Sequence, residues 1–468
     1  MLTRPLAGDF TLTGGRQRIH IVGVGGASMN AIATVLVAMG HEVSGSDSQD
    51  SPVLARLRGL GVRVYLGHEP ANVGDADLVA YSSAIDSANA ELAEARRRGI
   101  RLLRRAEILA ALCATRRTLA VGGTSGKTTT TAMLAWSLER AGMEPCYLVG
   151  GDLARTGSGA RWTSGEWLVV EADESDGTFL QLGAEGIIVT SVEPDHLEHY
   201  GGLDALVQAF ERFVTEAKGP RLVCIDDPGA AAVAARVGVA MTYGQSPGAD
   251  YRISTTELDA AGTAFEVMAK GKPLGRYELR LPGMHNVRNA TAALAVALEV
   301  GAPVDAVRGA LGSFAGVSRR FELRGSYGGV TYIDDYAHLP GKVRAALGAA
   351  RQQSWGRVIA VFQPHRYSRT AALWRDFADA FEGADMLVVT GIYGAGEPPR
   401  PGVSGRLVAD SVRGAHPDLP VEYVEERAEL VELLRHTLRP GDLCLTMGAG
   451  DLTTLPSELL GRKAEEAR

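Results

Sequence analysis

The chain has 468 residues and a net charge of −7, from 48 Lys and Arg against 55 Asp and Glu. Its hydrophobic share of 46% and charged share of 22% are ordinary for a soluble globular protein, and at roughly 100–200 residues per domain the length allows two to four domains. The mild acidity argues against a nucleic-acid-binding face, and no apolar run approaches the roughly 20 residues that span a bilayer. With no signal-peptide segment at the start and four widely spaced cysteines, the sequence predicts a cytoplasmic protein with reduced thiols that binds neither nucleic acid nor membrane.

Three blocks of the chain alternate β-branched runs, Gly-rich turns and helical patterns, which is typical of parallel sheets covered by helices. We expect one domain at residues 1–115, a second at 116–320 and a third at 321–468. The expected strands are 18–22, 42–47, 62–65, 78–81, 118–121, 167–171, 186–190, 330–333, 358–362, 386–390 and 443–447. The expected helices are 28–39, 52–60, one that begins at residue 127, and 286–300, and the charged tail 461–468 is expected to be frayed.

A Gly-rich turn at residues 23–28 follows the first strand and opens a helix, and Asp47 ends the next strand about 20 residues later. This layout is typical of a dinucleotide-binding turn, in which glycines let the backbone approach a diphosphate at the start of a helix, but Ser28 stands in place of the third glycine. From these residues alone, three interpretations stay open: an NAD(P) site, a site for another phosphate ligand, or a turn needed only for packing.

A second turn, at residues 122–126, follows the strand 118–121 and leads into Lys127 and Thr128. Glycines here let successive N–H groups face phosphate oxygens at the positive end of a helix, while the lysine reaches the β- and γ-phosphates and the threonine hydroxyl binds Mg²⁺. The match to a full P-loop is incomplete, because Val121 stands where the first glycine is required. An incidental lysine in a tight turn is the alternative, but the order of strand, turn, Lys-Thr and helix favours ATP binding.

Acidic and histidine side chains follow the next two expected strands of this block. The cluster at residues 171–176 comes at the carboxyl end of a strand, where open α/β sheets bind ligands, so Glu171 is a candidate Mg²⁺ ligand, direct or through water. A solvated acidic loop is the alternative. His196 follows the strand 186–190, and it could hold a second divalent ion, orient the γ-phosphate or be structural.

Two asparagines at the start of the helix 286–300 are a further candidate pair. Asn286 and Asn289 lie three residues apart and therefore project from one helix face, where their amides could bind the adenine edge or a phosphate. N-capping by Asn286 is the alternative.

Together these motifs resemble the Mur ligases, the family of ATP-dependent ligases that build peptidoglycan precursors. The shared stretches occur in the family's order and spacing and cover nearly the whole chain, from Ile19 to Asp451. They are residues 122–130, 171–176, 193–196 and 285–289, together with 24–26, 82–85, 334–338, 363–370 and 447–451. The last five stretches are most similar to the members that use UDP-N-acetylmuramate and L-alanine.

The resemblance implies an α/β fold with three domains: a Rossmann-like N-terminal domain for the UDP-sugar, a central P-loop-type ATPase domain with a mostly parallel sheet, and a Rossmann-like C-terminal domain that closes over the amino acid. It implies that ATP and Mg²⁺ convert the lactyl carboxylate of UDP-N-acetylmuramate into an acyl phosphate, which the amine of L-alanine then attacks. It also reassigns the first turn from NAD(P) to the UDP diphosphate. We expect a monomer or weak homodimer.

Carried over by position, the resemblance assigns roles to four groups of residues. The UDP-sugar group is Gly23, Gly25, Gly26, Ala27, Ser28, Met29, Asp47, Ser82 and Ser83. The ATP group is Gly122, Gly123, Thr124, Ser125, Gly126, Lys127, Thr128, Thr129, Asn286, Asn289 and Arg320, and the metal group is Thr128, Glu171 and His196. The catalytic group is Lys127, Glu171, His196, Arg320, Asp335, His338, Arg366 and Arg369. Within it, Arg366 and Arg369 face the acyl phosphate and the amino-acid carboxylate, and either His196 or His338 is the general base.

Several positions depart from the usual pattern of the family. Among them, Ser125 stands where the family has His, Ser191 where Asn is common, and Leu339 where a second His follows His338. Three competing hypotheses remain: a family member that attaches another amino acid or a preformed peptide, as a recycling ligase does; an NAD(P)-dependent oxidoreductase that uses the first turn; and a nucleotide-binding paralogue without ligase activity.

Overall fold

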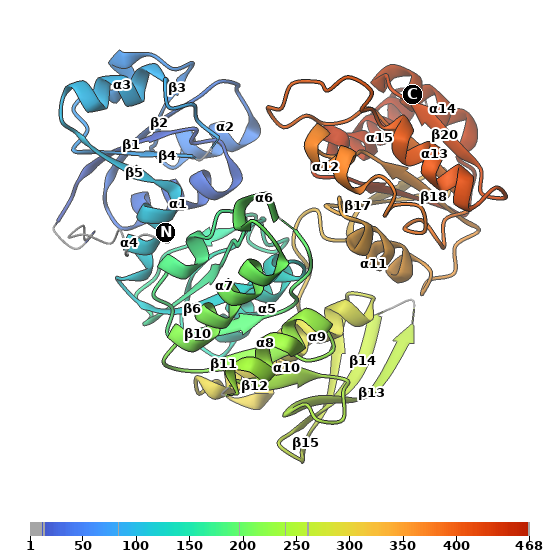
Figure 1. Ribbon diagram of the computed structural model, residues 1–468, viewed down its shortest axis with the longest axis horizontal. Helices are drawn as coiled ribbons and strands as arrows, with labels where there is room; N and C mark the ends of the chain where they lie inside the picture. The colour runs from blue at the N-terminus through green and yellow to red at the C-terminus, as the bar shows by residue number, and fades with distance from the viewer. Residues whose placement is uncertain are drawn as a thin grey trace. The chain divides into compact units, whose positions relative to one another are not determined.

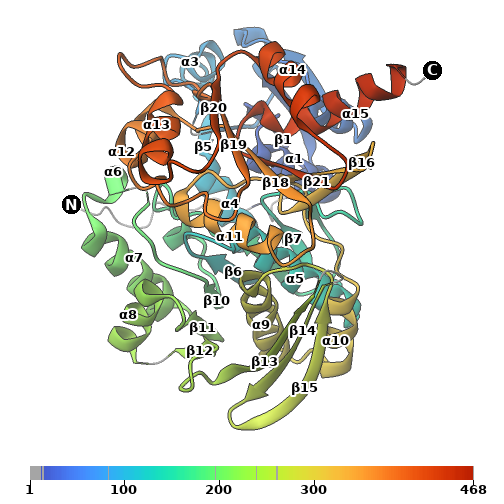
Figure 2. The same ribbon diagram turned by 90° about the vertical axis from the view of Figure 1, so that its right-hand side faces the viewer.

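The structure is a computed structural model, and it describes residues 12, 15–82, 84–195, 197–238, 240–259 and 262–466. The chain packs into two compact units, the first mainly up to Ala315 and the second mainly Gly316–Arg468. Helices flank three β-sheets, two in the first unit and one in the second (Figure 1, Figure 2). The predicted α/β class is confirmed, while the predicted boundary at residue 115 falls inside the first unit and stays a prediction.

The N-terminal sheet has five parallel strands in the order β3-β2-β1-β4-β5. Its strands are β1 (Arg18–Val22), β2 (Glu42–Asp47), β3 (Arg63–Leu66), β4 (Leu78–Tyr81) and β5 (Arg101–Arg104). Its helices are α1 (Ala27–Ala38), α2 (Pro52–Gly59), the 3₁₀ helix η1 (Pro70–Val73), α3 (Ala90–Arg97) and α4 (Arg105–Cys113). The strand order reverses between β1 and β4, which is the place where open sheets of this kind bind ligands. The turn after β1 therefore lies at the expected edge.

The central sheet has ten strands in the order β15-β14-β13-β12-β11-β10-β6-β9-β7-β8. Its strands are β6 (Arg117–Gly122), β7 (Cys146–Leu148), β8 (Ala160–Arg161), β9 (Trp167–Glu171), β10 (Gly186–Val189), β11 (Arg221–Cys224), β12 (Met241–Gly244), β13 (Tyr251–Asp259), β14 (Gly262–Ala269) and β15 (Lys272–Leu279). Its helices are α5 (Lys127–Arg140), η2 (Thr178–Gln181), α6 (Leu197–Tyr200), α7 (Leu203–Glu216), α8 (Pro228–Val237), α9 (Met284–Glu299) and α10 (Val304–Gly312).

Three neighbouring parallel strands, β10, β6 and β9, form the middle of this sheet. Val121 pairs with Glu171 and Gly122 with Val189, so the carboxyl ends of the three strands meet at one edge. The sequence did not predict β13, β14 and β15, which continue the sheet beyond β12. Their side chains alternate between buried and exposed over β14, so they lack the continuous apolar runs that identified the central strands.

The sheet of the second unit has six strands in the order β16-β17-β21-β18-β19-β20, all parallel except β16. Its strands are β16 (Glu322–Tyr327), β17 (Val330–Asp335), β18 (Arg357–Phe362), β19 (Met386–Thr390), β20 (Val421–Val424) and β21 (Asp442–Met447). Its helices are α11 (Pro340–Ala350), α12 (Tyr367–Leu373), α13 (Arg406–Ala415), α14 (Arg427–Thr437), η3 (Asp451–Thr454) and α15 (Leu455–Glu466).

The expectation of a frayed tail was wrong for residues 461–466, because α15 extends to Glu466. Leu455 and Leu459 are fully buried against the sheet, and this anchored first half lets the helix continue into its charged end. The last two residues lie outside the described part of the chain.

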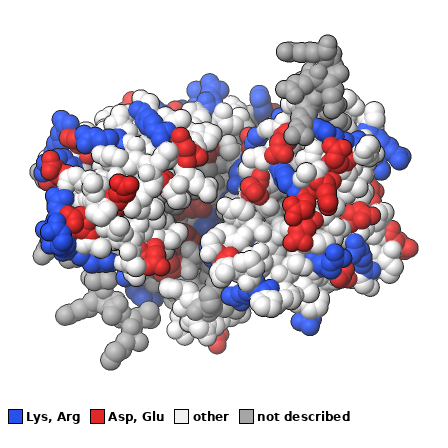
Figure 3. All heavy atoms as spheres, turned by 90° about the horizontal axis from the view of Figure 1, so that it is seen from above, with Lys and Arg blue, Asp and Glu red and all other residues white. Residues whose placement is uncertain are grey.

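Three global features bear on the sequence predictions. Within the described residues, all four cysteines are buried and none takes part in a disulfide bond. No helix in the same residues is both long and apolar enough to span a bilayer. On the face that Figure 3 shows, Lys and Arg side chains are interspersed with Asp and Glu side chains.

Candidate functional site

The turn between β6 and α5 has a backbone that only glycine adopts easily. Gly123 has a φ of 129°, and a Cβ there would lie 2.2 Å from the Oγ1 atom of Thr190. Gly126 has a φ of 84° and precedes α5 without any side-chain cap. The N-terminal N–H groups of α5 are thus turned toward the sheet edge, which is the arrangement that binds phosphate.

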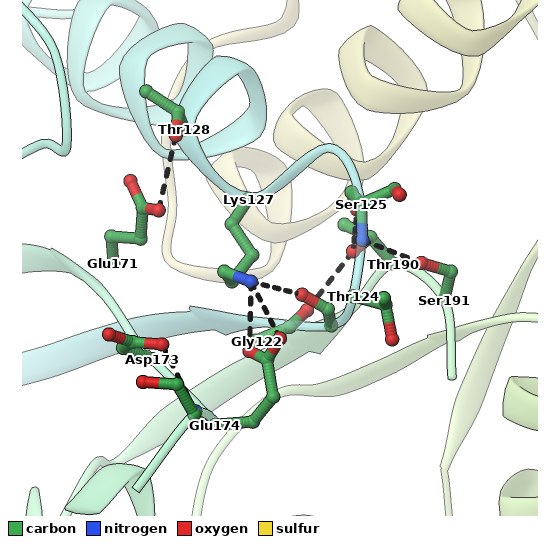
Figure 4. Close-up of polar contacts among 12 residues, drawn as sticks. Gly122, Thr124, Ser125, Lys127, Thr128, Glu171, Asp173, Glu174, Thr190 and Ser191 are labelled. Carbon is green, nitrogen blue, oxygen red and sulfur yellow. Dashed lines mark hydrogen bonds and ion pairs between the residues drawn. The ribbon is translucent and has the colours of Figure 1, made fainter. Parts of the chain in front are cut away.

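Lys127, the first residue of α5, lies over this turn with its ammonium group directed at acidic side chains (Figure 4). Its Nζ donates to both carboxylate oxygens of Glu174, at 2.9 and 2.8 Å, and to the carbonyl of Gly123 at 2.6 Å. Burial acts to lower the pKa of Lys127, but the charges of Glu174, Asp173 and Glu171 outweigh it, so the pKa lies above its ordinary value. The lysine is therefore a fixed positive charge at the turn.

Thr128 and Glu171, two of the three predicted metal ligands, lie side by side. The Thr128 hydroxyl donates to Oε1 of Glu171 at 3.1 Å (Figure 4). The Gly150 amide donates to Oε2 of the same carboxylate at 2.9 Å. A hydroxyl and a carboxylate are hard oxygen donors of the kind that Mg²⁺ uses together with phosphate and water, so the pair fits the predicted ion. His196 lies outside the described residues, and within the described ones no group of three His, Cys, Asp or Glu residues could hold a metal.

The segment after β10 holds the turn in place from the other side. The Ser125 amide donates to Oγ of Ser191 at 2.9 Å, and the Thr190 hydroxyl donates to the Ser125 carbonyl at 2.5 Å (Figure 4). The Glu193 amide donates to the Thr124 hydroxyl at 2.9 Å. These bonds position the two strand ends relative to each other.

The two predicted asparagines reach the same turn from α9. Asn286 and Asn289 are both buried, and the Asn289 amide contacts the Asn286 side-chain oxygen at 3.5 Å. A Cβ on Gly126 would lie 2.6 Å from Oδ1 of Asn289, so this side chain packs directly on the turn. Thr129 is also buried, inside the first turn of α5.

The turn after β1 is held by the end of β2. The Ser46 carbonyl accepts from the amides of both Gly23 and Val24, at 2.9 and 3.0 Å, and Asp47 accepts from the Gly25 amide at 2.9 Å. Gly26 precedes α1 without a side-chain cap, and Gly26, Ala27 and Ser28 are exposed. This turn presents an uncapped helix start to solvent, which is also suited to a phosphate group.

The other predicted UDP-sugar residues differ in their positions. A Cβ on Gly23 would lie 3.3 Å from Cβ of Ser82, so Ser82 borders the turn. Met29 is 1% exposed in the core beside α1, where its side chain packs rather than faces solvent. Ser83 lies outside the described residues.

In the second unit, Asp335 and His338 lie at the carboxyl end of β17. Asp335 accepts from the amides of Phe321 and Ala337, both at 2.8 Å, and burial raises its pKa to about 6. Burial, Lys342 and Arg369 hold the pKa of His338 well below its ordinary value. The Nδ1 atom of His338 lies 2.8 Å from the Tyr336 carbonyl, which can only accept, so Nδ1 carries the proton and Nε2 keeps its lone pair.

Three other predicted residues complete this edge of the second unit. The guanidinium of Arg320 lies 4.9 Å from the ring centroid of Tyr336. Arg366 has a φ of 67° and precedes α12, and Arg369 contacts Nδ1 of His365 at 2.8 Å. The rings of His365 and His338 lie 5.6 Å apart, so the residues predicted from the stretches 334–338 and 363–370 are brought together.

Sequence reasoning missed three residues that hold these edges. Glu174 was inside the predicted acidic cluster but not identified as the partner of Lys127. Arg105 donates to Asp173 and Asp176, and Arg319 donates to the carbonyls of Gly448 and Gly450. The partners of Arg105 are 68 and 71 positions away, and those of Arg319 are 129 and 131 positions away. Such separations carry no spacing signal, so these pairs could not be found in the sequence.

Three protein-family models match the chain in succession. The model of the Mur ligase family catalytic domain matches residues 18–117, and that of the Mur ligase middle domain matches residues 121–297. The model of the Mur ligase glutamate ligase domain matches residues 319–450.

Known proteins resemble the chain over nearly its whole length. The UDP-N-acetylmuramate–L-alanine ligase of Anaeromyxobacter sp. (strain Fw109-5) is 45% identical over 448 residues, which is 95% of this chain and 97% of the relative. The crystal structure of a UDP-N-acetylmuramate–alanine ligase from Thermotoga maritima matches with a TM-score of 0.84 and 29% identity, over 96% of this chain and 100% of that one. A murein peptide ligase from Psychrobacter arcticus shares the fold, with a TM-score of 0.71 and 24% identity over 95% and 98% of the two chains.

Proposed function

The chain belongs to the Mur ligase family, and from this premise we propose that it joins L-alanine to UDP-N-acetylmuramate in peptidoglycan precursor synthesis, with conversion of ATP to ADP and phosphate. The observation that carries the proposal is the 45% identity to a UDP-N-acetylmuramate–L-alanine ligase across 95% of the chain. The geometry of the turn before Lys127 supports the ATP-dependent step, because a partly buried cation and an uncapped helix start lie at the same turn.

The reaction has two steps, a phosphoryl transfer and an acyl transfer. The lactyl carboxylate of UDP-N-acetylmuramate attacks the γ-phosphorus of ATP, which gives an acyl phosphate and releases ADP. The amine of L-alanine then attacks the acyl carbon, a base takes the amine proton, and phosphate leaves. Positioning and charge neutralisation supply most of the catalysis of phosphoryl transfer.

In the first step, Lys127 exchanges the carboxylate of Glu174 for phosphate oxygens. Its raised pKa keeps it charged, so it offsets charge at the β- and γ-phosphates. Thr128 and Glu171 would hold Mg²⁺, which supplies further charge neutralisation when bound. His196 is proposed as a further ligand from the sequence alone. Asn286 and Asn289 are proposed to bind the nucleotide, and the residues 122–129 to surround its phosphates.

In the second step, His338 is the better-supported candidate for the general base. Its lowered pKa leaves the ring neutral near pH 7, and the bond from Nδ1 to the Tyr336 carbonyl leaves the Nε2 lone pair to accept a proton. Arg366 and Arg369 are proposed to bind the acyl phosphate and the amino-acid carboxylate, because a guanidinium pairs bidentately with both groups. Arg320 and Asp335 are proposed to act at the same stage.

The proposed function is tested by phosphate release from ATP and Mg²⁺ with UDP-N-acetylmuramate and an amino-acid panel. We expect release that depends on both substrates and is fastest with L-alanine, compared with glycine, L-serine and a preformed L-alanyl peptide. Fastest release with the peptide would favour the recycling ligase, and no dependent release would favour the inactive paralogue. Titration with NADH should show no binding. The expected cytoplasmic location and monomer or weak-homodimer state stay predictions.

A further inference from the structure

A group of polar side chains, none of them assigned a role above, lies mostly buried in the N-terminal sheet. We call it the Glu91 network: His20 on β1, Ser46 on β2, His68, Asn72 on η1 and Glu91 on α3. His20, Ser46 and Glu91 are each 0% exposed. No step of the proposed reaction uses any of these side chains.

Glu91 is the centre of this network. Its Oε2 accepts from the Ser46 hydroxyl at 2.6 Å and lies 3.1 Å from Nδ1 of His68, and its Oε1 accepts from the Asn72 amide at 2.7 Å. The Nε2 atom of His20 lies 3.6 Å from Oε1. Asn72, His68 and Ser46, which are 19, 23 and 45 positions away in the sequence, thus converge with the more distant His20 on one carboxylate.

Burying a carboxylate in a protein core costs desolvation free energy. Burial acts to raise the pKa of Glu91, and its interactions with His20, Ser46 and Asn72 outweigh this, so the pKa lies below its ordinary value and the group stays ionised. Replacing a buried charged cluster by well-packed apolar side chains is often neutral or stabilising. Stability alone therefore gives no reason for this network.

The network contacts the phosphate-binding turn through a single residue. The carbonyl of Ser46, whose hydroxyl binds Glu91, accepts the amides of Gly23 and Val24, and the next residue, Asp47, accepts the Gly25 amide. Gly45 allows the turn to pack closely, because a Cβ there would lie 2.7 Å from Cβ of Val24. The position of the β2 end therefore sets the position of three successive amides of the turn.

We propose that Glu91 is a positioning residue for the UDP diphosphate: through the Ser46 hydroxyl it fixes the end of β2, and with it the amides of residues 23–25. The inference rests on the proposed function, in which this turn binds the UDP-sugar. Glu91 does not touch the ligand. It acts by keeping the turn in its phosphate-binding shape before the ligand arrives, which reduces the ordering cost of binding.

The test compares the affinity for UDP with that for uridine, which lacks the diphosphate. Glu91→Gln keeps the shape of the side chain but replaces one carboxylate oxygen with an amide donor, and Ser46→Ala removes the hydroxyl that links Glu91 to β2. We expect each variant to weaken UDP binding about tenfold, the loss of one charge-assisted hydrogen bond, while uridine binding changes less than about twofold. In turnover, the KM for UDP-N-acetylmuramate should rise by a similar factor, with the KM for ATP unchanged.

Two controls separate positioning from a structural role. Glu94→Gln, one helical turn further along α3, changes a carboxylate that binds the exposed Arg97 and should leave both affinities unchanged. The double variant Ser46→Ala/Glu91→Gln should lose no more UDP affinity than whichever single variant loses more, because both substitutions act through one bond.

Each contrary outcome has a distinct meaning. A Glu91→Gln protein with a lower melting temperature but wild-type UDP affinity would show a structural role only and overturn the inference. Equal losses for UDP and uridine would show general damage to the site and also overturn it. Failure of the wild-type protein to bind UDP or UDP-N-acetylmuramate would overturn both the inference and the proposed sugar-nucleotide site.

Discussion

The two Gly-rich turns of the first unit share the order of strand, turn and helix but differ in backbone conformation and in charge. Each follows a buried parallel strand, and each ends in a glycine that begins a helix without a side-chain cap. The central turn continues into Lys127, which is paired with Glu174, beside the hydroxyl and carboxylate of Thr128 and Glu171. The N-terminal turn continues into Ala27 and Ser28, and its carboxylate, Asp47, is bonded to the Gly25 amide.

We propose that this difference separates a turn that holds a phosphate from a turn at which a phosphoryl group is transferred. Backbone amides at a helix start are enough to bind a diphosphate that does not react. A transferred phosphoryl group also needs a cation and metal ligands to neutralise developing charge. We therefore expect variants at the two turns to have separable effects on the two substrates.

The largest expected effect is that of Lys127→Ala. Loss of the only lysine at either turn removes charge stabilisation in the transition state, so kcat should fall by at least about 10³-fold. Binding of UDP-N-acetylmuramate, measured by calorimetry, should stay within about twofold of wild type because it uses the other turn. Lys272→Ala, an exposed lysine on β15, is the matched control. Loss of sugar-nucleotide binding in a folded Lys127→Ala protein would contradict the assignment of separate turns.

A pair of alanine variants tests the backbone difference. Gly123→Ala places a Cβ 2.2 Å from the Thr190 hydroxyl at a φ of 129°, whereas Gly26→Ala has a φ of −62° and its nearest new contact at 3.4 Å. Strain of about 1–3 kcal/mol predicts roughly a 10- to 100-fold loss of kcat/KM for ATP in the first variant. The second should change the KM for ATP by less than about threefold. Equal effects in steady-state kinetics would show that the two turns are equally constrained.

Asp47→Ala should weaken the binding of the sugar nucleotide and leave that of ATP unchanged. The variant leaves the Gly25 amide without its acceptor, so the turn loses one of its supports and the KM for UDP-N-acetylmuramate should rise about tenfold. The KM for ATP should not change. Asp50→Ala, an exposed aspartate that pairs with Arg58, serves as the control. A rise in the KM for ATP instead would count against the assignment of this turn.

The smallest effect is expected for Glu174→Gln, and it should be a lower free energy of unfolding. The pKa of Lys127 is raised in the folded state, so the pair stabilises the protein at neutral pH and loses this effect only as the pH rises through that pKa. A loss of about 1–2 kcal/mol at pH 7 predicts a melting temperature lower by roughly 2–6 °C. Saturating MgATP should shrink the difference, because phosphate takes the place of Glu174.

Glu166→Gln gives the control for this measurement, because Glu166 is exposed and forms an ion pair with Arg117. Calorimetry that shows the same Glu174→Gln difference with and without MgATP would mean that Lys127 keeps its carboxylate partner when the nucleotide binds.

Much of the fold could be predicted because its core strands are continuous apolar runs between turn signals. The strands 78–81, 167–171 and 386–390 agree with the structure at both ends. The strands β13–β15 could not be predicted, because half-exposed strands lack that pattern. α15, which the sequence did not predict, continues into the expected frayed tail because buried leucines of its first turns anchor it.

The candidate site shows the same division. Thr128 and Glu171 could be placed together because both follow neighbouring parallel strands, whose carboxyl ends meet at one edge. The contact between Ser125 and Ser191, two departures from the family pattern, could not be read from either position alone. The family resemblance assigned Met29 to the sugar nucleotide, and only the fold shows that its side chain is buried in the core beside α1.

The two Gly-rich turns, the acidic residues that follow the central strands, and the family can all be read from the sequence, because each is a local pattern of residue types at set spacing. The folded chain was needed to find that Glu174 is the partner of Lys127 and that the buried Glu91 is the partner of Ser46. These pairs join residues 47 and 45 positions apart, and their strength comes from burial, which a sequence does not display.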